Sequence, residues 1–200
     1  MRIYIKDMYS DVQKFNLEIE KTHPEKTFSI GLRKNLIAEE IKEWEQEIFK
    51  DKKSIEAIVK ESCDIVYVVL GGVIQMFPYN MATVATDVNV ITENDAIAKV
   101  LDNAKRFNST TDKMFLFPIL NGILNYVTYK IGFENFCTAW DIVHSSNMSK
   151  LENKSFDENG KVQKGDYTVA DLSFLKPKPK RKAKKLIEAD KTENNETATN

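Results

Sequence analysis

Apolar residues recur along most of the chain at the spacings of three and four that one face of an α-helix requires. The first set consists of Met8, Val12, Phe15 and Ile19. No pair of alternating segments is joined by a hairpin-type turn, so the pattern favours helices over strands. It predicts an all-α helical bundle, with helices over 1–21, 32–49, 55–77, 93–107, 113–131 and 133–146.

Local signals mark several of the helix ends. Ser54 is a predicted N-cap, and Thr92 with Asp95 resembles a capping box with Asp in place of Glu. Gly132 follows an apolar segment and is a predicted C-cap. The β-branched stretch 80–90 is predicted to be a loop or a weak helix. These signals divide the chain into compact helices with short connections.

Two stripes of different character run along the helix predicted over 32–49. At 100° per residue, Glu40, Glu43 and Glu47 fall on one narrow stripe. About 100° round the cylinder lies an apolar stripe formed by Ile37, Ile41, Trp44 and Ile48. The carboxylates therefore lie at the edge of the apolar face and not opposite it.

A second acidic pair opens the next helix. Glu61 and Asp64 are three residues apart and share a face, and the run 65–70 that follows is apolar on every side. Taken alone, the first acidic stripe also fits a solvated surface. Together the two acidic segments favour a metal site, because carboxylates at the wall of a core are costly unless cations balance them. Hard divalent cations such as Mg²⁺ take oxygen ligands of this kind.

The charge of the chain is unevenly distributed. The net charge is −1, but residues 176–200 hold eight Lys/Arg and four Asp/Glu. The remainder, 1–175, is predicted to be one all-α domain, and its acidic balance argues against a nucleic-acid-binding core. The tail 176–200 has the composition of a disordered segment. It either contacts nucleic acid weakly, docks on an acidic partner or keeps the protein in solution.

The sequence predicts an intracellular protein that does not associate with membranes. The first residues carry charges, and the longest apolar run, 65–77, is too short to span a bilayer. Cys63 and Cys137 lack a metal-type spacing and lie in apolar helical patterns. They are predicted to be reduced, buried thiols, so we expect a cytoplasmic location, in the host cytoplasm if the protein is viral.

Four motifs occur in an order that resembles a known superfamily. They are E-E-x-x-E at 39–43, E-x-x-D at 61–64, H-S-S-N-M-S-K-L at 144–151 and D-E-N-G-K-V-Q-K-G-D-Y at 157–167. The first two resemble the signature of the all-α NTP pyrophosphatases, which include the MazG-like enzymes, the dimeric dUTPases and the phosphoribosyl-ATP pyrophosphohydrolases. The last two are similar to a MazG-like branch frequent in phages and bacteria. The chain departs from that branch at 168–170, where T-V-A replaces prolines, and in the length of 82–131.

The resemblance implies a set of site residues. It implies that Mg²⁺, or Mn²⁺ in its place, is held by four carboxylates, those of Glu40, Glu43, Glu61 and Asp64. A second ion or its water would be held or oriented by Glu39 and Glu47. Contacts to a nucleoside triphosphate would come from Asn147, Lys150, Lys164 and Tyr167. His144 is predicted to be a histidine at a helix end, where the terminus favours its charged form.

Two functions from different classes follow. The first is a nucleotide pyrophosphohydrolase that converts a (d)NTP and water to a (d)NMP and pyrophosphate, as in nucleotide-pool house-cleaning. The second is a non-catalytic nucleotide-binding or assembly bundle with a basic docking tail. A dimer is also expected, by the resemblance and because the segment 115–129 has a broad apolar face, although this helix could instead pack inside its own monomer. That face is formed by Ile119, Leu120, Ile123, Leu124 and Val127.

Overall fold

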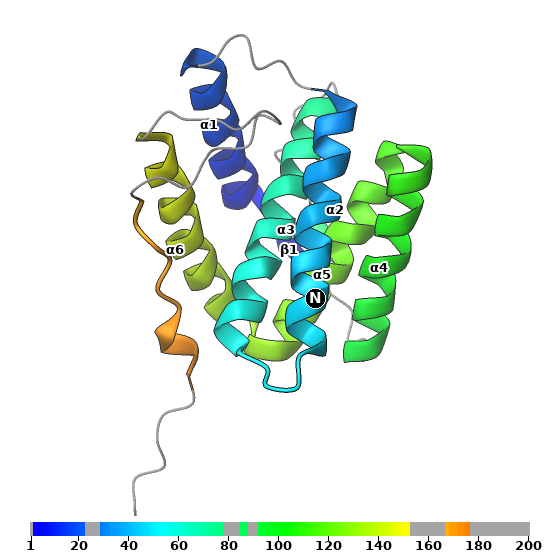
Figure 1. The fold of residues 1–200 in the computed structure, drawn as a ribbon, viewed down its shortest axis with the longest axis vertical. Helices are drawn as coiled ribbons and strands as arrows, with labels where there is room; N and C mark the ends of the chain where they lie inside the picture. The colour runs from blue at the N-terminus through cyan, green and yellow to red at the C-terminus, as the bar shows by residue number, and fades with distance from the viewer. Residues whose placement is uncertain (1, 23–28, 78–84, 88–91, 153–166, 177–200) are drawn as a thin grey trace, which may run out of the picture.

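The computed structural model describes residues 2–22, 29–77, 85–87, 92–152 and 167–176. Helices make up most of these ranges, so the all-α prediction holds at the level of class. Figure 1 shows α2 and α3 side by side in the middle of the bundle, with α1 and α6 on one side and α4 and α5 on the other. The α-helices are α1 Lys6–Thr22, α2 Ile30–Phe49, α3 Ile55–Met76, α4 Glu93–Thr110, α5 Leu116–Ile131 and α6 Phe133–Glu152. Two short 3₁₀ helices cover Lys113–Phe115 and Ser173–Leu175.

Helix α3 is central because it is apolar on every side, and it packs against α1, α2, α5 and α6. In the run 65–70, every side chain is buried except that of Val68, which is half-buried. The apolar stripe predicted on α2 is also confirmed, since each of its four side chains is at most 7% exposed. Trp44 of this stripe meets Tyr126 of α5 edge to face, with ring centroids 5.0 Å apart. These contacts hold α2 against α3 and α5.

Helix α5 is buried within its own chain. The five apolar side chains that were expected to exceed the capacity of a thin bundle are at most 1% exposed. The helix is covered by α3, α4 and α6. The prediction of a surplus apolar face is therefore wrong, and the expected dimer has no support from this helix. Among the described helices, moreover, none combines the length and the apolar character that crossing a bilayer requires.

Most predicted helix ends are confirmed. The Ser54 side chain accepts a hydrogen bond from the amide of Ala57, and Gly132 ends α5 with φ of 79°. The hydroxyl of Thr92 accepts from the amide of Asp95, as a capping box requires. Two predicted ends were wrong. The helix expected to end at 107 continues to Thr110, and the helix expected to end at 146 continues to Glu152, so the N-M-S-K motif is helical.

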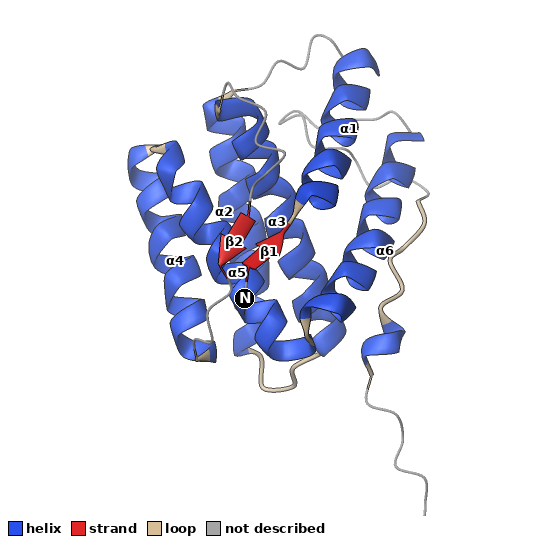
Figure 2. Ribbon diagram, turned by 180° about the vertical axis from the view of Figure 1, so that it is seen from behind, coloured by secondary structure: helices blue, strands red, loops and turns tan. Residues whose placement is uncertain are grey.

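A small sheet is another departure from the predicted elements, and it includes residues 2–4, which were expected to begin the first helix. Strand β1, Arg2–Tyr4, pairs antiparallel with β2, Ala85–Asp87, with Ile3 opposite Thr86. Figure 2 shows the pair lying against one side of the helices. The segment 80–90 was expected to be a loop or a weak helix, and its described part is a strand instead. The pairing escaped prediction because the two strands are three residues long and far apart in sequence, with no hairpin turn to mark them.

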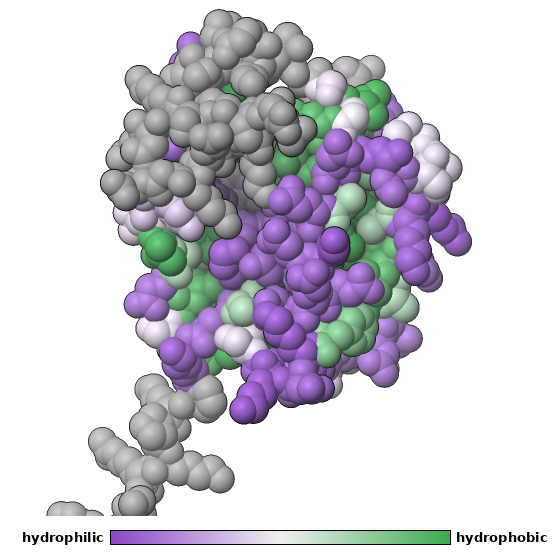
Figure 3. Space-filling view, viewed as in Figure 1, coloured by the Kyte–Doolittle hydropathy of each residue, from purple (hydrophilic) through white to green (hydrophobic). Residues whose placement is uncertain are grey.

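The outer face of α2 is separate from its acidic stripe. A groove between α2 and α4 has an apolar floor that includes Ile41 and Leu101, and it is edged by Lys42, Glu45 and Lys105. Figure 3 shows that the face of the molecule formed by these helices is largely hydrophilic, with apolar strips between the polar side chains. The residues that edge this groove provide surface positions away from the acids.

Candidate metal centre

Three of the predicted carboxylates meet where α2 packs on α3. One carboxylate oxygen from each of Glu40, Glu43 and Glu61 lies within 4.8 Å of the other two. Oxygens on opposite sides of a Mg²⁺ ion are about 4.1 Å apart, and those on Ca²⁺ about 5 Å. The triad therefore has the size of one coordination sphere. Glu40 is only 7% exposed, Glu61 is half-buried and Glu43 is exposed, so the triad extends from the interface of the two helices to the solvent.

The carboxyl group of Glu61 has a perturbed pKa. Burial raises the pKa of its carboxyl group, and the negative charges of Asp64 and Glu43 raise it further, while the ammonium of Lys60 opposes them. Its Oε2 atom is buried and, within the described part of the chain, has no hydrogen-bond partner. A buried, unpaired carboxylate oxygen is costly unless a cation or a donor reaches it.

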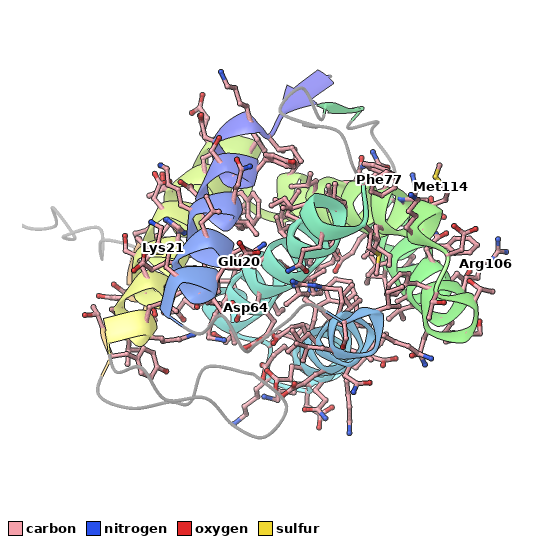
Figure 4. The ribbon with its side chains drawn as sticks, turned by 90° about the horizontal axis from the view of Figure 1, so that it is seen from above. Glu20, Lys21, Asp64, Phe77, Arg106 and Met114 are labelled. Atoms are coloured by element: carbon pink, nitrogen blue, oxygen red, sulfur yellow. The ribbon has the colours of Figure 1, made fainter. Side chains whose placement is uncertain are left out.

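Asp64, the fourth predicted ligand, lies outside this triad. Its Oδ2 accepts a hydrogen bond from Lys60 Nζ at 2.9 Å, and the same ammonium is 2.9 Å from Glu61 Oε1. Burial of Lys60 favours its neutral form, but the attraction of Asp64 and Glu61 prevails and the pKa of the lysine is raised. Figure 4 shows Asp64 on α3, seen from above. Lys60 therefore remains charged and holds the two α3 acids together.

The two remaining acids of the predicted set are not part of the triad. Glu47 is paired with Lys50, three residues further along α2. Glu39 is exposed at the surface of the same helix. The structure therefore concentrates the carboxylates in one group of three, and neither Glu39 nor Glu47 adds an oxygen to it.

Arg33, six residues before the first motif, links α2 to α3. Its Nε donates to Gln75 Oε1 at 3.1 Å, and its Nη1 donates to the carbonyl of Val68 at 3.2 Å. Burial lowers the pKa of the guanidinium to about 10. The guanidinium lies over Gly71, where an added Cβ would be 2.4 Å from Nη1. Gly71, which follows the second motif on α3, therefore makes room for this arginine.

The predicted substrate-binding residues form a second cluster on α6. Lys150 Nζ donates to Asn147 Oδ1 at 2.6 Å and lies 5.2 Å from the centroid of the Tyr167 ring. Asn147 is buried, and the backbone amide of Thr168 donates to Ser149 Oγ at 3.0 Å, which holds the segment after Tyr167 against the helix. Lys164 lies outside the described residues. The structure thus brings together three of the four residues that were predicted to contact the substrate, namely Asn147, Lys150 and Tyr167.

A chain of polar and aromatic contacts connects α3 to α6 and α1. The Tyr67 hydroxyl is 3.0 Å from His144 Nδ1, and His144 Nε2 is 3.7 Å from Asp11 Oδ1. Trp140 Nε1 donates to Asp11 Oδ2 at 3.0 Å, and the Trp140 ring stacks on Tyr67. His144 is in the interior of α6, so its assignment to a helix end was wrong. Burial lowers its pKa against the opposing charge of Asp11, so the neutral imidazole is favoured.

The contact between Tyr67 and His144 joins α3 to α6 close to Asp64 and Asn147 in sequence. Asp64 precedes Tyr67 by three residues on α3, and Asn147 follows His144 by three residues on α6. Residues three apart lie on the same face of a helix. Asp64 and Asn147 therefore each lie about one helical turn from the Tyr67–His144 contact.

Two residues that make contacts in this region, Lys60 and Asp11, were not predicted from the sequence. Lys60 was detectable, because it precedes Asp64 by four residues on a helix and opposite charges at that spacing attract. Asp11 had no such signal, since its partners on α6 are more than a hundred residues away.

Comparison with known proteins adds no relative: no protein-family model, no curated protein and no solved structure matches the chain. The assignment of the site therefore depends on the geometry above and on the motifs in the sequence.

The lowered pKa of His144 leads to a testable pH dependence. Because the unfolded chain binds the proton near pH 6.5 and the folded chain only at lower pH, the stability that neutral His144 provides is complete above 6.5. It is lost as the pH falls from 6.5 through the lowered folded pKa. We expect urea unfolding to show a steeper loss of stability below pH 6.5 for the wild-type protein than for His144→Gln. Parallel curves for the two proteins would contradict the buried, neutral state of His144.

Proposed function

We propose that the protein is a metal-dependent nucleoside triphosphate pyrophosphohydrolase. The observation that carries the proposal is the triad of Glu40, Glu43 and Glu61, whose oxygens lie within 4.8 Å of one another. The resemblance of four ordered motifs to the all-α NTP pyrophosphatases supports the reaction, which converts a (d)NTP and water to a (d)NMP and pyrophosphate. The cluster on α6 supports a nucleotide as the substrate.

The residues present fit a hard divalent cation. All three side chains offer oxygen, which Mg²⁺ and Mn²⁺ prefer, and the unpaired Oε2 of Glu61 is the kind of atom that an ion would satisfy. Glu40, Glu43 and Glu61 would hold the ion. When bound, it would neutralise phosphate oxygens and lower the pKa of a coordinated water.

The remaining roles belong to side chains on α6 and after it. The Lys150 ammonium would balance the negative charge of the phosphate group that lies farthest from the acids. The ring of Tyr167 offers a face on which a base can stack. Asn147 is buried and held by Lys150, so its amide is fixed in place for a hydrogen bond to the base or the sugar. Nothing in this set selects one base over the others.

Product analysis with a panel of nucleotides tests the proposal. The full chain is incubated with each NTP and dNTP in the presence of Mg²⁺, and phosphate is measured with and without added inorganic pyrophosphatase. We expect phosphate to appear only when pyrophosphatase is present, and chelation of the metal to abolish formation of the nucleoside monophosphate. Phosphate release without pyrophosphatase would mean cleavage of the terminal phosphate instead. Nucleotide binding without turnover would favour a non-catalytic nucleotide-binding bundle.

A further inference from the structure

Lys60 is bonded to the same carboxylate that completes the metal triad. Its Nζ atom lies 2.9 Å from Glu61 Oε1 and 2.9 Å from Asp64 Oδ2. The side chains of Glu61 and Asp64 are 12% and 17% exposed, whereas that of Lys60 is 45% exposed. The ammonium thus covers two largely buried acids from the solvent side.

The two oxygens of Glu61 are in different environments. Oε1 accepts a hydrogen bond from Lys60, while Oε2 is buried without a partner among the described residues. Glu61 belongs to the triad with Glu40 and Glu43 and also accepts a hydrogen bond from Lys60, so it borders two cation positions. The first is within the triad with Glu40 and Glu43, and the second, between Glu61 and Asp64, is filled by the lysine.

A second divalent ion would have to displace this ammonium. The ion would need Glu61 Oε1 and Asp64 Oδ2 as ligands, and both already accept hydrogen bonds from Lys60.

We propose that Lys60 serves as a built-in second cation and limits the acidic site to one divalent ion. The inference depends on the proposed function only in that Glu40, Glu43 and Glu61 hold a metal. It assigns Asp64 to positioning Lys60 and not to metal ligation. Lys60 is therefore a positioning residue that sets the metal stoichiometry.

Titration of the full chain with Mn²⁺ alone tests the inference, with the free ion measured by electron paramagnetic resonance. We expect the wild-type protein to bind one Mn²⁺ per chain. Lys60→Met removes the charge and frees two carboxylate oxygens, so this variant is expected to bind two. Lys60→Arg keeps the charge and should bind one. Lys105→Met, which removes an exposed positive charge from the groove on α4, is the matched control and should also bind one.

Asp64→Asn provides a second test that does not depend on the folding of the methionine variant. If Asp64 only positions Lys60, this variant should still bind one Mn²⁺, with an affinity within about tenfold of the wild type. Loss of the bound ion would show that Asp64 is a ligand and would overturn the inference. Two ions in the wild-type protein, or one in a folded Lys60→Met variant, would overturn it as well while leaving the proposed function intact. No bound ion in the wild-type protein would instead contradict the proposed function itself.

Discussion

Glu61→Gln is expected to reduce pyrophosphate release by roughly 100-fold or more, because the substitution removes a charged ligand from the centre of the triad. Even partners that only orient metal ligands cost 10-fold to about 100-fold when they are lost. Glutamine has nearly the same size as glutamate but carries no charge, so the variant does not bury a charged group at this position. We therefore expect the variant to be at least as stable as the wild type. Steady-state kinetics with Mg²⁺ and a urea unfolding curve measure the two effects.

Glu45→Gln is the matched control for this prediction. Glu45 is on the same helix but edges the groove toward α4, away from the triad. The substitution removes the same charge and should leave kcat/KM nearly unchanged. Equal losses in both variants would point to a general effect of charge on substrate attraction. A Glu61→Gln protein with near-normal turnover would remove Glu61 from the site.

Gly122→Ala is expected to lower the free energy of unfolding by about 1–3 kcal/mol, because it overpacks the contact between α4 and α5. A Cβ atom at Gly122 would be 2.8 Å from Val100 Cγ2 and 3.2 Å from the backbone nitrogen of Val100. The valine methyl can turn away only in part, and the backbone of α4 can yield only by moving the whole helix. Urea unfolding followed by circular dichroism gives the difference in free energy.

Gly31→Ala is the corresponding control on α2. The atom nearest to a Cβ at this position is Ser29 Oγ, 3.9 Å away, so nothing has to move. Alanine also favours a helix more than glycine does. We expect this protein to be as stable as the wild type or slightly more stable. An unchanged unfolding midpoint for Gly122→Ala would mean that α4 and α5 pack less closely than the structure describes.

The helical part of the fold was predictable because its signals are local. Caps such as Ser54 and Gly132 act within one turn of the chain, and the stripes on α2 and α3 repeat every three or four residues. The larger errors concern contacts that are distant in sequence, whereas the ends of α4 and α6 and the position of His144 within its helix were local errors. The apolar face of α5 was assigned to a partner molecule because the sequence does not show that α3, α4 and α6 cover it. The pairing of β1 with β2 was missed for the same reason.

The candidate site was predictable to the same extent. Helical periodicity placed Glu40 and Glu43 on one face and Glu61 on the next helix, and the structure joins them. The same reasoning did not show that Lys60 would take Asp64 out of the set, since the i, i+4 attraction was not weighed against metal ligation. The contacts from Tyr67 through His144 to Asp11 could not be predicted from the sequence, because they join three helices from different parts of the chain.

The position of the triad on a single helical hairpin has a consequence for the order of folding. Helices α2 and α3 are joined by residues 50–54 only, so bringing them together costs little loop entropy. The bond from Trp140 to Asp11, in contrast, spans 129 residues and must wait for most of the chain. We infer that the acidic hairpin forms early, before α1 and α6 close over α3. A divalent ion would then act on the rate of folding as well as on the finished site, since its ligands lie on two helices that are neighbours in sequence.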